Sequence, residues 1–302
     1  MLELKNVTKI SNHHPLVENL SLSVREGEIF GLLAPAAAGK TTILRLLLTV
    51  LRPDQGEIIY GDKKIKKLAP RFFGYIPQMR GIYPRAKVIT YLVYNGVLNQ
   101  LSKSSAYHAA RDMLHQFELF PLAEFRLEDL NTEFQEKILI IATILHQPSI
   151  WIIDEPYSGF SPANESLIES LVAQFKYDNK FIIIASRNLD RAEKICERVC
   201  LLDKGHLILN LTLPEIKTQI KDNIFYLETA DDISALKQIK EIQIKQEIKN
   251  QYKITLRDKS FDTYKLISAL NKNIRIIKFE QFRPGLAYIY TQLVKNMQRS
   301  KK

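Results

Sequence analysis

The stretch "GEIFGLLAPAAAGKTTILRLLLTVL", residues 27–51, decides the fold of this chain. It begins as an apolar run, passes through an alanine-rich loop and continues as "KTTILRLLLTVL", whose apolar residues have helical spacing. A buried strand, a loop and a helix in this order form the context that a phosphate-binding loop requires. The first question is therefore whether residues 34–42 bind phosphate.

The loop matches the end of the pattern G-x-x-x-x-G-K-[ST] and departs from its beginning. Gly39, Lys40 and Thr41 are in place, whereas Ala34 and Ala37 stand where glycine is usual. Backbone N–H groups would cradle the phosphates, the lysine would reach the β and γ oxygens, and the threonine would supply a hydroxyl to Mg²⁺. Where a positive φ is needed, alanine costs roughly 1–2 kcal/mol and its methyl group crowds the phosphate. We therefore expect weakened nucleotide binding rather than none.

A second motif, "SIWIIDEP" at residues 149–156, supports the nucleotide site. Its apolar residues 150–153 form a predicted buried strand that carries Asp154 and Glu155 at its end. An aspartate in this place can hold Mg²⁺, and the adjacent glutamate can orient or deprotonate an attacking water. Each motif alone has a plain explanation, such as a helix cap or a chance Gly-Lys-Thr. Together, and in this order, they favour a nucleotide site.

The rest of the chain predicts two domains. Residues 1–221 alternate strands and helices, which indicates an α/β core with a mostly parallel sheet. Residues 85–146 are mainly helical and predict an inserted helical subdomain. Residues 222–302 read as β-α-β-β-α-β, the ferredoxin-like α+β order, with residues 232–240 as the first helix and a basic tail at the end.

Composition excludes some classes of protein. Hydrophobic residues make up 46% and charged residues 25% of the 302, an ordinary globular balance. No apolar run approaches the roughly 18 residues of a membrane-spanning helix, and the start has no signal-peptide pattern, so we expect a cytoplasmic protein. The net charge is +10, but no recognisable nucleic-acid motif accompanies it, so we expect no nucleic-acid partner.

These residues and four further stretches give the chain a family resemblance. "GYIPQMRGIYPRAKV" resembles a glutamine loop, with Gln78 at the characteristic position. "ILHQPSIWIIDEPYSGFSPAN" resembles a second nucleotide motif and the loop that follows it, and "AEKICERVCLLDKGHLI" resembles the stretch after a switch histidine. "FEQFRPGLAYIYTQL" is similar to the end of a small accessory domain. Over essentially its whole length the chain resembles the ATP-binding subunits of ABC transporters, most closely exporter-type subunits that pair with a separate membrane permease.

The resemblance implies a fold, ligands and partners. It implies a P-loop ABC ATPase core that binds ATP and Mg²⁺ at the inner face of the cell membrane, as a homodimer or a heterodimer beside a permease. Asp154, Thr41 and Gln78 would hold the metal, Glu155 would be the general base, and Gln78 would also sense the γ-phosphate and contact the permease. Arg187 would stand beside the phosphates. The phosphate loop would comprise Ala34, Pro35, Ala36, Ala37, Ala38, Gly39, Lys40, Thr41 and Thr42.

Several positions depart from the family's pattern. The signature Leu-Ser-Gly-Gly-Gln aligns with residues 130–134, "LNTEF", and Glu133 would place a carboxylate near the γ-phosphate of a partner's site. The switch histidine aligns with Arg187, which can contact phosphate but cannot shuttle a proton at neutral pH. Ser161 stands where an aspartate is expected, and the adenine-stacking aromatic residue aligns near Ser11.

Two hypotheses follow from this mixture of retained and lost residues. In the first, the chain binds ATP and hydrolyses it slowly to drive export. In the second, it is a non-hydrolytic pseudo-ATPase that regulates or scaffolds a membrane complex. A phosphate-loop kinase or GTPase would leave the glutamine loop, the helical subdomain and the accessory domain unexplained.

Overall fold

The structure is a computed structural model. It describes residues 1–11, 13–36, 38–78, 81–219, 224–234, 236–248, 250–257, 263–282 and 284–300. These residues form two compact units, one of residues 1–213 with the C-terminal residues from 290 on, and one of residues 214–289. The domain boundary that we predict at residue 221 lies outside the described residues. Residues 290–300, which we assign by sequence to the second domain, cluster with the first unit.

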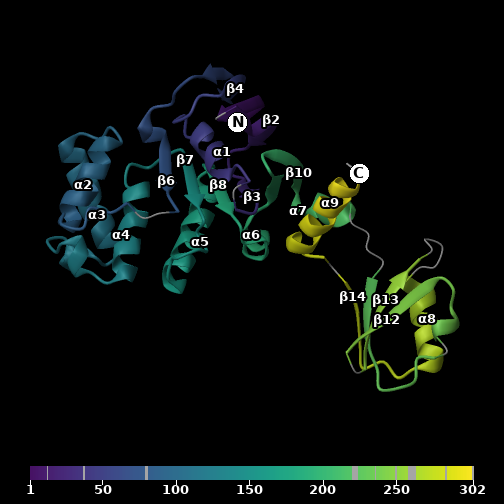
Figure 1. The fold of residues 1–302 in the computed structure, drawn as a ribbon. Coiled ribbons are helices and arrows are strands. Elements are labelled where there is room, and N and C mark those ends of the chain that lie inside the picture. The colour runs from purple at the N-terminus through teal and green to yellow at the C-terminus, as the bar shows by residue number, and fades with distance from the viewer. Residues whose placement is uncertain are drawn as a thin grey trace. The chain divides into compact units, whose positions relative to one another are not determined.

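A six-stranded sheet forms the centre of the first unit (Figure 1). Its strand order is His206–Thr212 (β10), Arg198–Asp203 (β9), Ile29–Leu33 (β3), Phe181–Ser186 (β8), Ile150–Asp154 (β7) and Phe73–Ile76 (β6). All neighbouring pairs are parallel except β10 with β9. Strands β3, β7 and β8 are buried along their whole length, which is why they read as continuous apolar runs.

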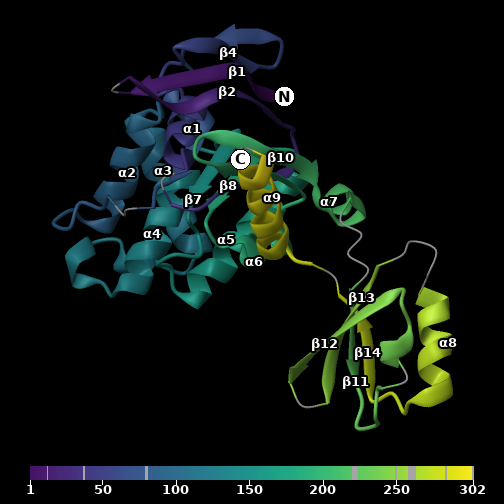
Figure 2. The ribbon, with the colours of Figure 1, turned by 45° about the vertical axis from the view of Figure 1, so that its right-hand side comes forward.

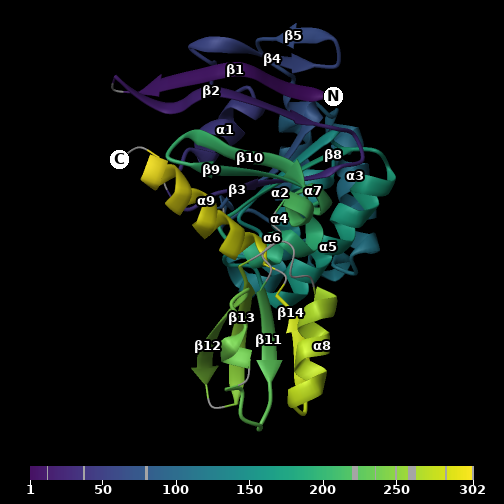
Figure 3. The same ribbon diagram turned by 90° about the vertical axis from the view of Figure 1, so that its right-hand side faces the viewer.

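A second, antiparallel sheet covers the first helix. Its order is His14–Val24 (β2), Leu2–Ser11 (β1), Gln55–Tyr60 (β4) and Lys63–Ile65 (β5). Helix α1 (Lys40–Leu47) lies between this sheet and the parallel one (Figures 2 and 3). One hydrophobic core joins both sheets to this helix, because Ile43 and Leu44 are fully buried among residues such as Leu4 and Phe30. The phosphate loop is therefore anchored at both ends in the core.

Three helices form the helical part of the first unit, gathered on one side of it (Figure 1). They are α2 (Val88–Leu98), α3 (Lys103–Gln116) and α4 (Thr132–Ile144), with short 3-10 turns at Phe120–Leu122 and Leu127–Asp129. They enclose a separate core that includes Leu92, Leu114 and Ile138. The first unit also contains α5 (Pro162–Tyr177), α6 (Leu189–Ile195) and a 3-10 turn at Pro70–Phe72. Helix α7 (Leu213–Gln219) falls almost wholly among the residues of the second unit, and α9 (Leu286–Ser300) belongs to the first unit from Tyr290 on. In the described part of the chain, none of the helices is long and apolar enough to cross a membrane.

The second unit is an antiparallel sheet with one helix on its face (Figure 3). The strand order is Ile242–Ile248 (β12), Gln251–Leu256 (β13), Ile224–Glu228 (β11) and Lys278–Gln281 (β14). Helix α8 (Thr263–Asn273) packs Leu266 and Leu270 on this sheet. The helix predicted at residues 232–240 is wrong in type, because the described residues there form only a 3-10 turn, Leu236–Gln238. Asp232 accepts hydrogen bonds from the amide and hydroxyl of Ser234, and this turn takes up the start of the segment.

Candidate functional site

The loop between β3 and α1 is fixed by a glycine that no other residue can replace. Gly39 has φ +93°, and a Cβ there would lie 2.8 Å from the backbone oxygen of Leu16. Side chains rarely adopt that conformation, and the contact leaves no room for a methyl group. Helix α1 begins at the next residue, so the unpaired N–H groups of its first turn face the loop.

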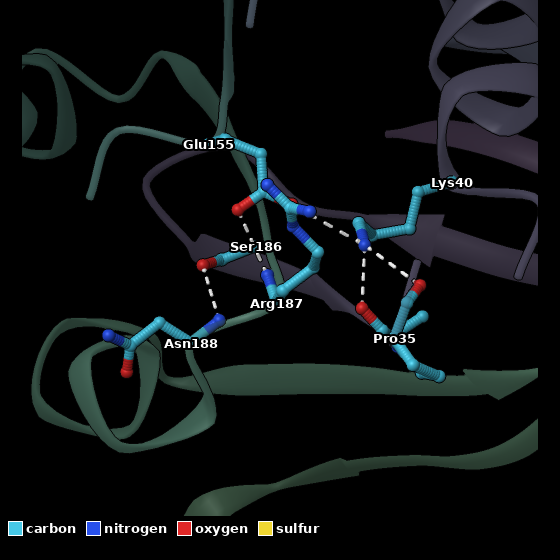
Figure 4. Close-up of polar contacts among 7 residues, drawn as sticks. Pro35, Lys40, Glu155, Ser186, Arg187 and Asn188 are labelled. Atoms are coloured by element: carbon cyan, nitrogen blue, oxygen red, sulfur yellow. Dashed lines mark hydrogen bonds and ion pairs between the residues drawn. The ribbon is translucent and has the colours of Figure 1, made fainter. Parts of the chain in front are cut away.

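Lys40 lies across this loop (Figure 4). Its Nζ donates hydrogen bonds to the backbone oxygens of Ala34, at 2.6 Å, and Pro35, at 3.3 Å. Burial lowers the pKa of the lysine, and the nearby Glu155 carboxylate partly offsets this effect. The ammonium group is thus held by carbonyl oxygens that bind less tightly than a phosphate would.

The alanines of the loop are accommodated differently from our expectation. Ala34 does not have a positive φ, so the expected strain does not arise there. Both Ala34 and Ala38 are buried members of the hydrophobic core, so their methyl groups pack with the sheets and α1. Ala37 lies outside the described residues. Of the two lost glycines, the one at position 34 therefore does not block the loop.

The strand β7 delivers two carboxylates to the carboxyl edge of the sheet. Asp154 is its last residue and Glu155 follows, and each is only 4% exposed. Glu155 has φ +57°, and its backbone N–H donates to the oxygen of Ala185 on β8 at 2.8 Å. A left-handed backbone at a residue other than glycine is uncommon and is concentrated at functional sites.

Asp154 carries a raised pKa. Burial, and then the Glu155 carboxylate, raise it to about 6, while Lys40 and a hydrogen bond with Tyr75 act in the opposite direction. At neutral pH the carboxyl group is therefore mostly ionised and able to bind a cation. The Thr41 hydroxyl and the Gln78 amide line the same cavity, and oxygen donors of these kinds are the ligands that Mg²⁺ prefers.

Glu155 is shared between two cations (Figure 4). The Arg187 side chain donates from Nε to Oε1 at 3.0 Å, and the Arg187 backbone N–H donates to Oε2 at 3.1 Å. The Lys40 ammonium lies 3.5 Å from Oε1. The backbone before the arginine is itself fixed, because the N–H of Asn188 donates to the hydroxyl of buried Ser186. Both oxygens of the Glu155 carboxylate thus accept a hydrogen bond from Arg187, and one of them also lies beside the Lys40 ammonium group.

A cavity of about 550 Å³ brings the predicted residues together. With the exception of Ala34, every described residue that we assign to the site by sequence lines this cavity. The backbone oxygen of Ala34 accepts a hydrogen bond from Lys40, which does line it. Four lining residues were missed by sequence reasoning, namely Pro15, Leu16, Lys204 and Gly205. They come from β2 and from the β9–β10 turn, and no motif marks them, because only strand pairing brings these segments to the loop.

Comparison with known proteins identifies the family. The model of the ABC transporter family matches residues 17–158, and a model described as the C-terminal domain of DrrA1-3-like ATP-binding proteins matches residues 212–294. The uncharacterized ABC transporter ATP-binding protein YhaQ of Bacillus subtilis is 30% identical over 97% of this chain and 98% of its own length. The chain belongs to the ABC transporter ATP-binding proteins.

Other members of the family agree with this assignment. The lipopolysaccharide export ATP-binding protein LptB of Escherichia coli is 29% identical over 71% of this chain and 92% of its own length. The Nod factor export ATP-binding protein I of Cupriavidus metallidurans is 30% identical over 69% of this chain and 70% of its own. The fold matches the ATP-binding cassette MJ0796, solved as a dimer with ADP and phosphate, at a TM-score of 0.62 and 21% identity over 70% of this chain and 99% of that chain. The predicted P-loop ABC ATPase fold is confirmed.

In this ABC ATP-binding subunit, the stretch aligned with the signature motif forms the capped N-terminus of helix α4. Asn131 is the N-cap of α4, and its side chain accepts a hydrogen bond from the backbone N–H of Phe134 at 2.9 Å. Glu133 stands exposed in the first turn of the helix. The Phe134 amide at this helix N-terminus is thus hydrogen-bonded within the helix cap. The other free amides of the first turn lie near the Glu133 carboxylate.

Ser161, which replaces the expected aspartate, has a structural role. Its backbone N–H donates to Oε2 of Glu136 at 2.8 Å, and its hydroxyl caps α5. Asn164 donates from Nδ2 to the same Glu136 oxygen and to the backbone oxygen of Glu133, both at 2.8 Å. Glu136 is only 2% exposed. This cluster ties the start of α4 to the loop after β7.

Proposed function

We propose that this ABC subunit couples ATP binding and slow hydrolysis to export through a separate membrane permease. The observation that carries the proposal is the double contact of Arg187 with Glu155, at 3.0 and 3.1 Å. The expected general base is present and buried, which supports catalysis, but it is held by a guanidinium group, which slows it. The export names of two relatives support the direction of transport.

ATP binding rests on the phosphate loop. Its backbone N–H groups and the start of α1 would bind the phosphates, and Lys40 would exchange the oxygens of Ala34 and Pro35 for phosphate oxygens. Thr41, Gln78 and Asp154 would hold Mg²⁺, which when bound neutralises charge on the phosphoryl oxygens. Thr42 lines the cavity beside them.

The slow step is proton removal from the attacking water. Glu155 must orient that water and take its proton, yet its oxygens are engaged by Arg187 and Lys40. A carboxylate oxygen that already accepts from Arg187 or lies beside Lys40 is not free to orient and deprotonate a water. Arg187 cannot take part in proton transfer itself. Hydrolysis therefore waits until the guanidinium group leaves Glu155, and contact with the γ-phosphate is the interaction that would draw it away.

The partners follow from the family. The subunit would lie at the inner face of the membrane, with the Gln78 loop against its permease, and would dimerise with a second nucleotide-binding subunit. Each nucleotide site of such a dimer would be formed by the phosphate loop of one subunit and the signature stretch of the other. In a homodimer, both sites would contain Arg187 and the altered signature stretch, residues 130–134. In a heterodimer with a subunit of the usual pattern, each site would carry one of these two changes.

ATP titration and phosphate release test the proposal together. Purified protein, with its permease and Mg-ATP, should bind ATP and release phosphate, Lys40→Ala should weaken binding, and Glu155→Gln should abolish release while binding persists. Thermal unfolding of both variants controls for folding. Phosphate release that survives Glu155→Gln would refute the proposed mechanism.

The second candidate, a non-hydrolytic regulatory or scaffold subunit, is favoured by one observation. Asn131 caps α4 internally and Glu133 stands in its first turn, so this helix end offers little to a partner's γ-phosphate. In that case ATP titrates the protein but no phosphate is released above the Glu155→Gln background. Release at a rate that depends on Glu155 excludes this candidate.

A further inference from the structure

The C-terminal helix contacts a turn at the edge of the nucleotide cavity. From Tyr290 on, α9 clusters with residues 1–213 and lies beside the β9–β10 hairpin (Figure 3). The Tyr290 hydroxyl donates a hydrogen bond to Oδ1 of Asp203 at 3.3 Å. Asp203 is the last residue of β9, and the next two residues, Lys204 and Gly205, line the cavity. The helix thus holds a turn that borders the site, and the proposed phosphate and metal binding do not account for this contact.

The turn between β9 and β10 is a two-residue hairpin with a well-defined backbone. Asp203 pairs with His206, and the residues between them are left-handed, with φ +47° for Lys204 and +82° for Gly205. A turn of this type matches the right-handed twist of its strands and is therefore a preferred connection. Because Gly205 follows Asp203 so closely in this fixed geometry, a restraint on the aspartate also restrains the glycine.

The turn packs directly on the phosphate loop. The backbone N–H of Gly205 donates to the oxygen of Ala38 at 3.2 Å. A Cβ on Gly39 would lie 3.6 Å from the Cα of Gly205, and a Cβ on either glycine would collide with the backbone oxygen of Leu16. Glycine at both positions lets three backbones meet without side chains between them. The turn therefore supports the loop at the point where α1 begins.

The phosphate loop benefits from being held in place before a nucleotide binds. Its phosphate ligands would be backbone N–H groups, which act together only when they point at one centre. Ordering a loop on binding subtracts from affinity, and restraint in the free protein removes that cost. Gly39 is conformationally permissive, so the restraint must come from its neighbours. The contacts from Ala38 through Gly205 and Asp203 to Tyr290 supply such a restraint from outside the loop.

We propose that Tyr290 and Asp203 form a latch that positions the phosphate loop, so that the C-terminal helix sets the affinity of the nucleotide site. The proposal rests on the proposed ATP binding and adds its control by α9. Both are positioning residues, because neither is among the described residues that line the cavity and they act through Gly205 and Ala38. When the latch opens, the turn and the loop loosen together, and the affinity for every ligand held by its phosphates falls alike.

Hydrogen exchange and paired titrations of the full chain test this latch. Tyr290→Phe removes the hydroxyl and keeps the ring, Asp203→Ala removes the acceptor, and Asp203→Asn removes the charge but keeps an acceptor oxygen. Without nucleotide, the amides of residues 38–44 should exchange at least about fivefold faster in Tyr290→Phe and Asp203→Ala, and as in wild type in Asp203→Asn. The first two variants should bind Mg-ATP and Mg-tripolyphosphate about two- to tenfold more weakly, and by the same factor for both ligands. The double variant Tyr290→Phe with Asp203→Ala should lose no more than either single variant, because both remove one contact.

A matched control removes a phenol elsewhere. Tyr226→Phe, on β11 of the second unit, should change neither exchange nor binding. Unchanged exchange in Tyr290→Phe would overturn the inference, as would losses that add in the double variant or a loss for ATP without one for tripolyphosphate. A wild-type protein that binds neither ligand better than Lys40→Ala would remove the proposed function, while the exchange measurement, which needs no nucleotide, still decides whether the latch holds the loop. Thermal unfolding of each variant separates a loosened loop from a lost fold.

Discussion

Glu155 is the residue on which the proposed hydrolysis depends. It is 4% exposed, its backbone is left-handed, and both of its oxygens are engaged by Lys40 or Arg187. A carboxylate whose oxygens are occupied by two cationic side chains is not free to orient an attacking water. Under the proposed function, an arginine in place of the family's switch histidine therefore does more than remove a proton carrier, because it would also restrain the general base.

Asp154 gives a prediction for the pH dependence of stability. Its pKa is about 6 in the folded protein against 3.8 as the ordinary value, so the folded state binds its proton more tightly. Stability from this group is fully present below about pH 4 and is lost as pH rises towards 6, on the order of 2–3 kcal/mol. Urea unfolding in EDTA at stepped pH, for wild type and Asp154→Asn, isolates this contribution. A wild-type minus variant difference that stays constant from pH 4 to 7 would contradict the prediction.

At the scale of elements, the cluster of Glu136, Asn164 and Ser161 joins α4 to the loop after β7. Replacing Glu136 by alanine removes the acceptor of the Ser161 N–H and one of the two acceptors of the Asn164 amide. We expect Glu136→Ala to lower the free energy of unfolding by roughly 1–3 kcal/mol, measured by urea denaturation.

An exposed ion pair provides the control for that measurement. Glu124 lies 2.7 Å from Lys87 with its side chain 72% exposed, and surface pairs of this kind contribute about 0–1 kcal/mol. Glu124→Ala should therefore have the smaller effect. Equal losses in the two variants would mean that the buried cluster does not stabilise the joint.

Elements with a strong local pattern are predictable from this sequence, and those set by tertiary contacts are not. Strands β3, β7 and β8 are buried on both faces, so continuous apolar runs mark them. The segment 232–240 has helical spacing, but its described part holds a side-chain turn from Asp232 to Ser234 and then only the 3-10 turn Leu236–Gln238. Local propensity gave no sign of this competition.

At the scale of the whole molecule, the nucleotide cavity contains residues that none of the sequence motifs marks. Sequence reasoning found the residues on the carboxyl ends of β3 and β7 because each follows an apolar run in a known order. It missed Leu16 and Lys204, which reach the cavity through strand pairing, and it misjudged Ala34, whose methyl group is in the core. The burial of one methyl group cannot be deduced from its place in a pattern.

Self-association gives a second prediction at this scale. The hydrolysis-blocked variant Glu155→Gln should stay monomeric with Mg-ATP when tested alone, because Glu133 would repel the partner's γ-phosphate. Adding Asn131→Ser, Thr132→Gly, Glu133→Gly and Phe134→Gln to that variant should produce an ATP-dependent dimer by analytical ultracentrifugation. A dimer of equal strength without these four replacements would show that the departed signature stretch still closes a homodimer.

The restraint of Glu155 by Arg187 is tested most directly by single-turnover phosphate release from pre-bound Mg-ATP. The comparison uses wild type, Arg187→His and Arg187→His with Glu155→Gln, each in the same complex with the permease. We predict that Arg187→His releases phosphate at least roughly tenfold faster than wild type, and that Glu155→Gln abolishes the gain. A rate for Arg187→His at or below that of wild type, or a gain that survives Glu155→Gln, would contradict the claim that the arginine restrains the base.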